Sequence, residues 1–243
     1  MNTYRWFKIG KISGSFGSSD LSLLAVPDQG DEWFEIDREA EDAIDARFFQ
    51  KIKLSYDQLS PSGAIDANTL ECVRSVLFRV STRDGLSTVR VQDNMRVVTS
   101  LLASLARKLG FGFYIEPIGF RSALDLFAVK GLASLSSYDS ARIVSAKASG
   151  ADISAGIVGR FEFSSKAGFE ISDISSRLPS GFRLESVKAE VTKVGASGAF
   201  TFSSIGRCSI SGRLSPFILE DVENRLIYGS FGMGAKGPPF GFR

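Results

Sequence analysis

Alternation of apolar and polar residues with a period of two constrains the fold of this chain more than any other feature. It runs through three segments of the C-terminal half, at 157–164 (IVGRFEFS), 183–194 (RLESVKAEVTKV) and 199–213 (AFTFSSIGRCSISGR). Successive side chains of a strand point to opposite faces of its sheet, so the pattern is typical of strands with one buried face. We therefore expect a C-terminal half built mainly from antiparallel strands.

The N-terminal half mixes two periodicities. Segments 3–13 (TYRWFKIGKIS) and 70–80 (LECVRSVLFRV) alternate roughly and predict strands. Segment 33–51 predicts an acidic amphipathic helix, because its apolar residues recur near a helical spacing. Together with the C-terminal strands, these elements predict an α+β fold with mostly antiparallel sheets.

The strongest helix signal lies at 91–109 (VQDNMRVVTSLLASLARKL). Arg107 and Lys108 fall in its last turn, where cations complement the helix dipole, and Gly110 follows as a terminating residue. A second, shorter helix is predicted at 216–226, with Pro216 near its first turn. Residues 122–149 show no pattern that decides between a helix and a loop.

Composition excludes several kinds of chemistry. The chain has 243 residues and no histidine, which rules out Ser-His-Asp triads and most transition-metal sites. Cys72 and Cys208 are far apart and form no metal-binding pattern, so we expect two small buried thiols, no metal and a reducing compartment. The N-terminus lacks a signal-peptide core and the apolar runs are short, so we expect a cytoplasmic protein with no membrane partner.

Charge is distributed unevenly along the chain. Residues 1–70 carry 7 Lys/Arg against 12 Asp/Glu, whereas residues 71–147 carry 11 against 6. A basic segment within a chain of net charge +2 is typical of a local footprint for a polyanion such as RNA. Exposed arginines are also common on surfaces with no ligand, and that alternative stays open.

The last fifteen residues, 229–243 (GSFGMGAKGPPFGFR), form a glycine-rich segment that contains Lys236 and three phenylalanines. Glycine permits positive φ and lets a phosphate approach backbone N–H groups closely. The phenylalanines can anchor such a loop or stack on bases. The alternative is a flexible tail, although a disordered segment usually lacks large apolar residues at regular intervals.

Within this segment, Gly232-Met233-Gly234, followed after six residues by Gly241-Phe242, resembles the glycine-rich loop of the repeat-associated (RAMP) RNA-binding superfamily of CRISPR systems. In that superfamily the loop lies between the last helix and the final strand of a ferredoxin-like domain. The resemblance therefore implies two ferredoxin-like (RRM-like) domains with antiparallel sheets, 1–145 and 146–243, and an inserted basic helical segment around 85–130.

The resemblance also implies a function, the metal-independent cleavage of CRISPR repeat RNA hairpins. In this reaction a ribose 2′-OH attacks the adjacent phosphorus and leaves a 2′,3′-cyclic phosphate, with no cofactor. Many members of the family use a histidine base, and this chain has none. It therefore looks most like the type IV CRISPR variant that relies on arginines and tyrosines. Its partners would be the repeat hairpin, the mature guide RNA and other CRISPR effector subunits.

Candidate catalytic residues follow from what a phosphoryl transition state requires. Guanidinium groups stabilise charge that develops on the phosphate oxygens, which suggests Arg38 first and Arg5 next. Tyr56 is a candidate acid or base. The alternatives are an ordinary ion pair for Arg38, which lies in an acidic run, and an ordinary buried side chain for Tyr56.

Candidate RNA-binding residues come from the glycine-rich segment, the first strand and the basic middle of the chain. They are Gly232, Gly234, Lys236, Gly237, Gly241, Lys8, Arg90, Arg96, Arg107, Lys108 and Arg121. Arg96 and Arg107 are eleven residues apart, about three helical turns, so they fall near one helix face. The same helix can equally be a solvated one over an apolar stripe of Val97, Leu101 and Leu105.

Two other functions remain open beside the endoribonuclease. One is a non-catalytic CRISPR effector subunit that binds the guide RNA handle, which the absence of histidine favours. The other is a β-rich structural or assembly protein that binds no nucleic acid.

Overall fold

The structure is a computed structural model in which two compact units are distinguished. The N-terminal unit comprises Tyr4–Glu116, and the C-terminal unit comprises Pro117–Arg243 together with Met1–Thr3. The predicted boundary between residues 145 and 146 falls within a strand of the second unit. The structure describes residues 1–12, 16, 20, 22–25, 30–40, 42–59, 61, 63, 65–83, 86–92, 95–120, 137–152, 157–169 and 182–232.

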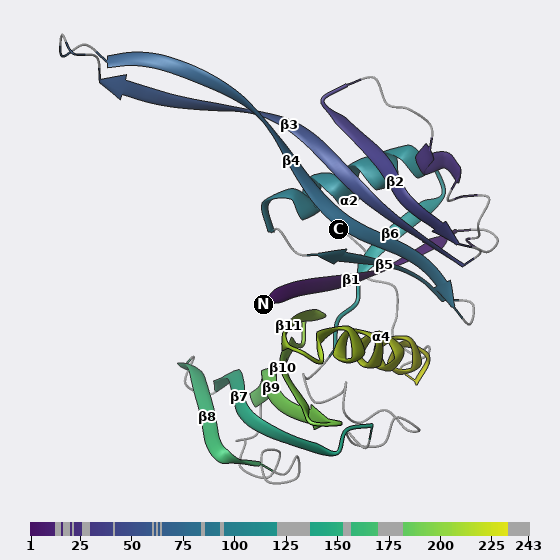
Figure 1. The fold of residues 1–243 in the computed structure, drawn as a ribbon, viewed down its shortest axis with the longest axis vertical. Coiled ribbons are helices and arrows are strands. Elements are labelled where there is room, and N and C mark those ends of the chain that lie inside the picture. Colours follow the sequence, from purple (N-terminus) through teal and green to yellow (C-terminus); the bar gives the residue numbers. More distant parts are fainter. Residues whose placement is uncertain are drawn as a thin grey trace. The chain divides into compact units, whose positions relative to one another are not determined.

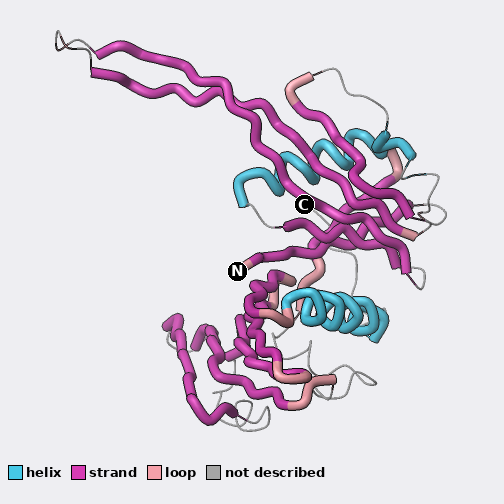
Figure 2. Tube along the Cα trace, in the orientation of Figure 1, coloured by secondary structure: helices cyan, strands magenta, loops and turns pink. Residues whose placement is uncertain are grey.

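The N-terminal unit is a twisted sheet with one helix on it (Figures 1 and 2). Its strands are β1 (Asn2–Lys11), β2 (Glu32–Ala40), β3 (Ala43–Leu59), β4 (Ile65–Arg83), β5 (Leu86–Gln92) and β6 (Phe113–Pro117). Their order is β2-β3-β4-β5-β1, and β6 also pairs with β1. A short 3-10 helix, η1 (Ser22–Ala25), precedes β2. The predicted strands at 3–13 and 70–80 are confirmed by β1 and β4.

Helix α2 (Met95–Leu109) covers one face of this sheet. Val97, Leu101 and Leu105, spaced four residues apart, are all fully buried in one core cluster with strand residues such as Phe48 and Phe78. The predicted helix at 91–109 is thus confirmed with a later start, since Val91 belongs to β5. Gly110 ends it with a φ of 85° and donates its N–H to Ala106 O at 3.1 Å.

The predicted acidic helix at 33–51 is wrong, because this segment forms the β2–β3 hairpin. The two strands are antiparallel neighbours that pair as far as Ala40 and Ala43. Cross-strand aromatic pairs stabilise the hairpin: Trp33 stacks on Phe49 with ring centres 5.0 Å apart. The apolar residues that suggest a helical spacing also satisfy a period of two, and pairing with β4 decides between the two periods.

The C-terminal unit contains five antiparallel strands and one described helix. Its strands, in the order β11-β10-β9-β7-β8, are β7 (Ser140–Asp152), β8 (Ile157–Phe169), β9 (Phe182–Lys193), β10 (Ala196–Ser203) and β11 (Arg207–Gly212). The turn after β9 holds Val194 and Gly195 at φ values of 50° and 73°, as a type I′ hairpin turn requires. These strands confirm the alternating segments predicted in this half, except that a turn between Ser203 and Arg207 divides the segment 199–213 into β10 and β11.

Helix α4 (Ser215–Gly232) follows β11. It confirms the helix predicted at 216–226 but continues to Gly232, so the first glycine of the predicted loop motif is helical. Ile218, Val222 and Leu226, again four residues apart, are buried.

The predicted fold class is wrong. The described residues form eleven strands and two α-helices, so the protein is mostly β and is not a pair of α+β ferredoxin-like domains. One reason is that the segment expected to supply the first helix is the β2–β3 hairpin. A second is that the supposed helical insertion contains α2, which packs on the sheet as part of its core.

Candidate functional site

The three predicted catalytic residues lie far apart in the N-terminal unit. Arg5 is on β1 and Arg38 on β2, and β3, β4 and β5 lie between these strands, a separation of about 19 Å at the usual strand spacing. Arg38 is paired with Asp45 on β3, and Tyr56 lies about 36 Å farther along that strand. The structure therefore does not bring the three side chains into one site.

The predicted glycine-rich loop falls largely outside the described residues. Gly232 is the last residue of α4, and the remaining loop candidates, Gly234, Lys236, Gly237 and Gly241, lie beyond it. Arg121 is also outside the described residues, and of Arg96 only its place on α2 is described.

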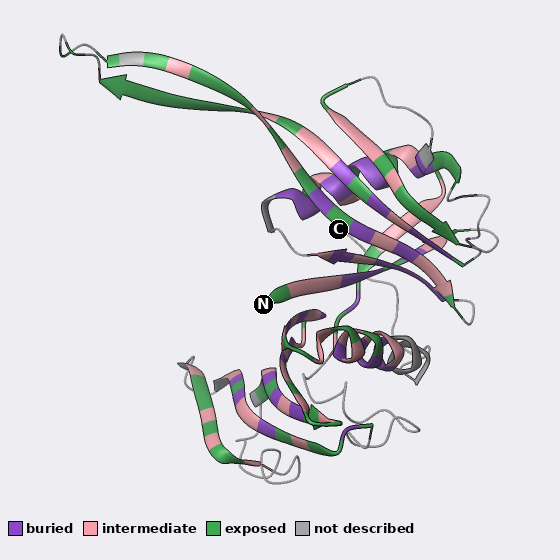
Figure 3. Ribbon diagram, in the orientation of Figure 1, coloured by how far each residue is buried: buried purple, intermediate pink, exposed green. Residues whose placement is uncertain are grey.

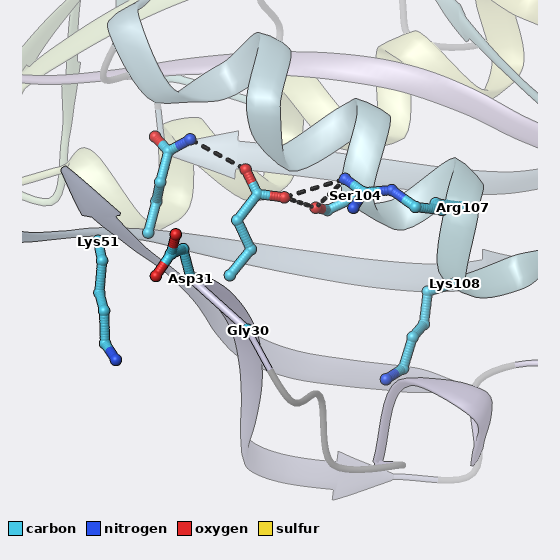
Figure 4. Close-up of a pocket in the computed structure, with 8 residues that line it drawn as sticks. Gly30, Asp31, Lys51, Ser104, Arg107 and Lys108 are labelled. Carbon is cyan, nitrogen blue, oxygen red and sulfur yellow. Dashed lines mark hydrogen bonds and ion pairs between the residues drawn. The ribbon is translucent and has the colours of Figure 1, made fainter.

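Arg107 and Lys108, at the end of α2, line a cavity of about 560 Å³ together with residues at the start of β2 and in the middle of β3. Figure 4 shows Ser104 and Arg107 converging on one carboxylate, while Lys51 and Lys108 extend away from it. That carboxylate is Glu32, whose Oε2 accepts hydrogen bonds from Ser104 and, at 3.0 Å, from Arg107.

The other carboxylate oxygen of Glu32, Oε1, accepts a hydrogen bond from Gln50 Nε2 at 2.9 Å. Both oxygens of Glu32 are therefore bonded within the protein, and Arg107 neutralises the charge. This network ties the β2–β3 hairpin to the end of α2, a structural role, and it leaves no unbonded carboxylate oxygen on Glu32 to act as a base.

A row of charged side chains crosses the sheet face that points away from α2. Arg38, Asp45, Arg79 and Arg90 are paired directly opposite one another on β2, β3, β4 and β5. Their α2-facing neighbours, such as Ala46 and Phe78, are buried in the core, which places this row on the other face.

The charges in this row are partly compensated. Both carboxylate oxygens of Asp45 accept from Arg79 Nη1, at 3.1 and 3.3 Å. The guanidinium of Arg90 lies 5.8 Å from the ring centre of Tyr4 on β1. Sequence reasoning selects Arg38 and Arg90 but misses Arg79, because only the strand register shows that the three arginines share a line. Lys8, exposed on β1, pairs with Thr88 and lies outside the row.

The longest hairpin of the unit continues past the rest of the sheet (Figure 1). Within the described residues, Lys51–Leu59 of β3 and Ile65–Val73 of β4 pair with each other and, apart from the bond from Lys51 N to Asp31 O, with no other strand. The pairing of β3 with β2 stops at Gln50, and that of β4 with β5 stops at Phe78. We call these two stretches the arm. Nine residues of strand give it a length of about 30 Å.

One face of the arm is apolar and exposed. Leu54, Tyr56 and Leu70 are 42%, 49% and 52% exposed, and they lie on the same face because Leu54 pairs with Leu70 and Tyr56 is two residues farther along the strand. The opposite face carries Lys53 and Glu71, whose charged groups are 3.3 Å apart. Figure 3 shows the arm coloured mainly as exposed, in contrast to the buried strands under α2.

The C-terminal unit contains a buried polar network that joins Tyr138 to α4. Tyr138 donates to Asp221 Oδ2 at 3.1 Å, and Arg225 Nε donates to the same oxygen at 3.0 Å. Burial, and then the charge of Asp221, raises the pKa of Tyr138 well above its usual value. Because the Asp221 charge is paired within the unit, we assign this network to the stability of α4.

Comparison with known proteins assigns no function to these features. No protein-family model matches the chain, and a search of curated proteins finds no match. No helix among the described residues is long and apolar enough to cross a lipid bilayer. The part of the chain that the structure describes also contains no cluster of three or more metal-ligating side chains.

Proposed function

We propose that this protein is a structural subunit that builds an assembly through its arm. The observation that carries this proposal is the exposed apolar face formed by Leu54, Tyr56 and Leu70 on a ribbon that no other described element covers. A contiguous exposed apolar patch marks a protein interaction site.

Energetics support the same proposal. An isolated two-stranded ribbon is marginally stable in water, since it buries little surface for the backbone entropy that it loses. Covering three large apolar side chains offsets part of that entropy, and because each is about half exposed, its full burial contributes roughly half of the 1.5–3 kcal/mol of a fully exposed side chain. A ribbon of this length is therefore best explained by a partner that covers it.

Sedimentation velocity over a range of protein concentrations tests this function. We expect the wild type to form species larger than one chain, and a Leu54→Ser/Leu70→Ser double variant to form less of them at the same concentration. Ile205→Ser is the matched control, because Ile205 is 58% exposed and lies outside the arm. A wild type that stays monomeric at every concentration would contradict the proposal.

A second candidate, RNA binding by a non-catalytic CRISPR effector subunit, is favoured by the arginine row. Arg38, Arg79 and Arg90 share one line across four strands, with Asp45 in that line and Asp37 beside it in the cavity that Arg90 and Asp45 line. Guanidinium groups bind phosphate oxygens in a bidentate manner, so such a line can follow an RNA backbone. Arg38→Ala/Arg90→Ala should weaken binding of a repeat-derived RNA hairpin and reduce its salt dependence.

Cleavage of that hairpin has less structural support than binding, because the candidate catalytic residues Arg5, Arg38 and Tyr56 are separated by tens of ångströms. The hairpin is incubated with the protein in EDTA and run on a denaturing gel. Cut RNA supports the endoribonuclease, and a mobility shift without cutting supports the binding subunit. If the RNA is neither cut nor shifted, both RNA functions fail for that hairpin and assembly alone stands.

A further inference from the structure

We propose that the partner of the arm is a second copy of this chain, joined along the edge of β3 in a two-fold antiparallel pair that places Ser55 opposite Ser55 of the other copy. This inference rests on the proposed assembly function and names its partner and register. It follows from three observations on the arm: which backbone groups face the edge, how the charges are spaced, and where the exposed apolar residues lie.

The first observation is the direction of the backbone groups. Lys51 N donates to Asp31 O at 2.7 Å, on the side of β3 where β2 ends. The N–H and C=O groups of alternate residues point to the same side of a strand, so those of Lys53, Ser55 and Asp57 face this edge too. Within the described residues no strand pairs with them there. Such a row of groups is a template for another strand.

The second observation is the spacing of charge. In a two-fold antiparallel pair centred on Ser55, Lys53 of each copy lies opposite Asp57 of the other copy, so the symmetry produces two such pairs. Leu54 lies opposite Tyr56 of the other copy on the apolar face, again twice. The strand segment is therefore complementary to itself in both charge and apolarity, and about six backbone hydrogen bonds form between the copies.

The third observation concerns the exposed apolar residues on the charged face of the arm. Leu59 and Ile65, each 70% exposed, pair with each other near the tip, and Val73, 57% exposed, pairs with Lys51 near the base. The position opposite Lys51 on this edge is already taken by Asp31, whose O accepts from Lys51 N, so the pairing between copies ends at Lys53 and Asp57. Leu59 and Ile65 at the tip of each arm therefore lie beyond the segment that pairs.

The edge of β4 is a poorer match along the arm. Between Ile65 and Val73 its charged residues are Asp66 and Glu71, both acidic, so two such stretches form no opposite-charge pair, and the first cation, Arg74, lies at the base. Pairing through β3 also places Leu54, Tyr56 and Leu70 of both copies on one continuous face, which larger assemblies can cover.

Disulfide cross-linking at the two-fold axis tests the register. Opposed residues of a hydrogen-bonded antiparallel pair have Cα atoms about 5.5 Å apart, within the range that a disulfide spans. In a Cys72→Ala background, where the only other cysteine is the buried Cys208, Ser55→Cys should form a covalent dimer on mild oxidation. Thr69→Cys is the matched control, because Thr69 is the exposed partner of Ser55 on β4.

We expect at least about tenfold more covalent dimer from Ser55→Cys than from Thr69→Cys. Assembly by sedimentation without Ser55→Cys cross-linking would overturn the β3 pairing and leave the assembly function standing. A chain that is monomeric by sedimentation would overturn both. Preferential cross-linking of Thr69→Cys would move the contact to β4 and also overturn the proposal.

A charge variant gives an independent measurement. Asp57 is paired with Ala67 within the arm, so Asp57→Lys leaves the arm's own ion pair between Lys53 and Glu71 in place. Between two copies the introduced lysine faces Lys53 twice, and we expect about tenfold weaker self-association, with an intermediate effect for Asp57→Asn. Unchanged association of Asp57→Lys would count against this register.

Discussion

The base and the arm of the β3–β4 hairpin differ in their neighbours, since only the base is flanked by β2 and β5 and covered by α2. Both parts alternate apolar and polar residues in the same register along the same two strands. At the base, Phe48 and Val76 are buried beneath α2, whereas in the arm Leu54 and Leu70 continue the same face without a cover among the described residues. Alternation therefore sets which face of a strand is apolar, and the neighbouring elements decide whether that face is buried within the chain.

The largest difference in stability is expected when one apolar side chain is truncated in the base and one in the arm. Phe48→Ala should lower the free energy of unfolding by about 3–5 kcal/mol, because Phe48 is fully buried and the change leaves a cavity. Leu54→Ala should lower that of the monomer by no more than about 0.5 kcal/mol. Chemical denaturation of dilute protein measures both, and similar losses would contradict the assignment of base and arm.

An intermediate effect concerns alkaline pH. Burial raises the pKa values of Cys208 and Tyr138, so both groups stay protonated in the folded state. In the unfolded state the cysteine loses its proton above about pH 8.5 and the tyrosine above about pH 10. Stability is full below these values and falls as pH rises, by about 1.4 kcal/mol per pH unit for each group. Denaturation midpoints between about pH 8 and pH 11 measure this fall.

Cys208→Ala and Tyr138→Phe provide the controls for the alkaline experiment. Each should flatten the part of the pH curve that its own group causes. If the double variant loses stability as steeply as the wild type, the fall has another origin.

The smallest expected effect concerns the reactivity of the two cysteine thiols, one in the arm and one in the core of the C-terminal unit. Cys208 is fully buried in the C-terminal unit, and Cys72 is half-buried in the arm, two residues from Leu70 on the same face. A thiol reagent at neutral pH should therefore modify one group per folded chain, at Cys72, with no change in the monomer's stability beyond about 0.5 kcal/mol. Modification of Cys208 at a comparable rate would contradict its burial.

Much of the fold could be predicted from periodicity, and its failures have physical causes. The strands at 183–194 and 199–213 and the helix over Val97, Leu101 and Leu105 follow from local patterns. The hairpin at 33–51 does not, because Phe34, Ile44 and Phe48 satisfy both periods and the choice depends on pairing with β4, whose partner residues are distant in the sequence.

The candidate sites depend still more on long-range pairing. Leu54 and Tyr56 alternate with polar residues as in any half-buried strand, so the sequence cannot show that this face is uncovered. The line of Arg38, Arg79 and Arg90 exists only through the register of four strands. The place of Arg107 at a helix end follows from the sequence, but its partner Glu32 is 75 residues away along the chain.

Hydrogen exchange along β3 at low and high protein concentration tests the central claim, that the arm is an interface, most directly. We predict that the amides of Lys53, Ser55 and Asp57 exchange at least about tenfold more slowly at high concentration, because they then donate to another chain. The amides near Phe48 at the base should exchange slowly at both concentrations. Arm amides that exchange at the same fast rate throughout would contradict the account.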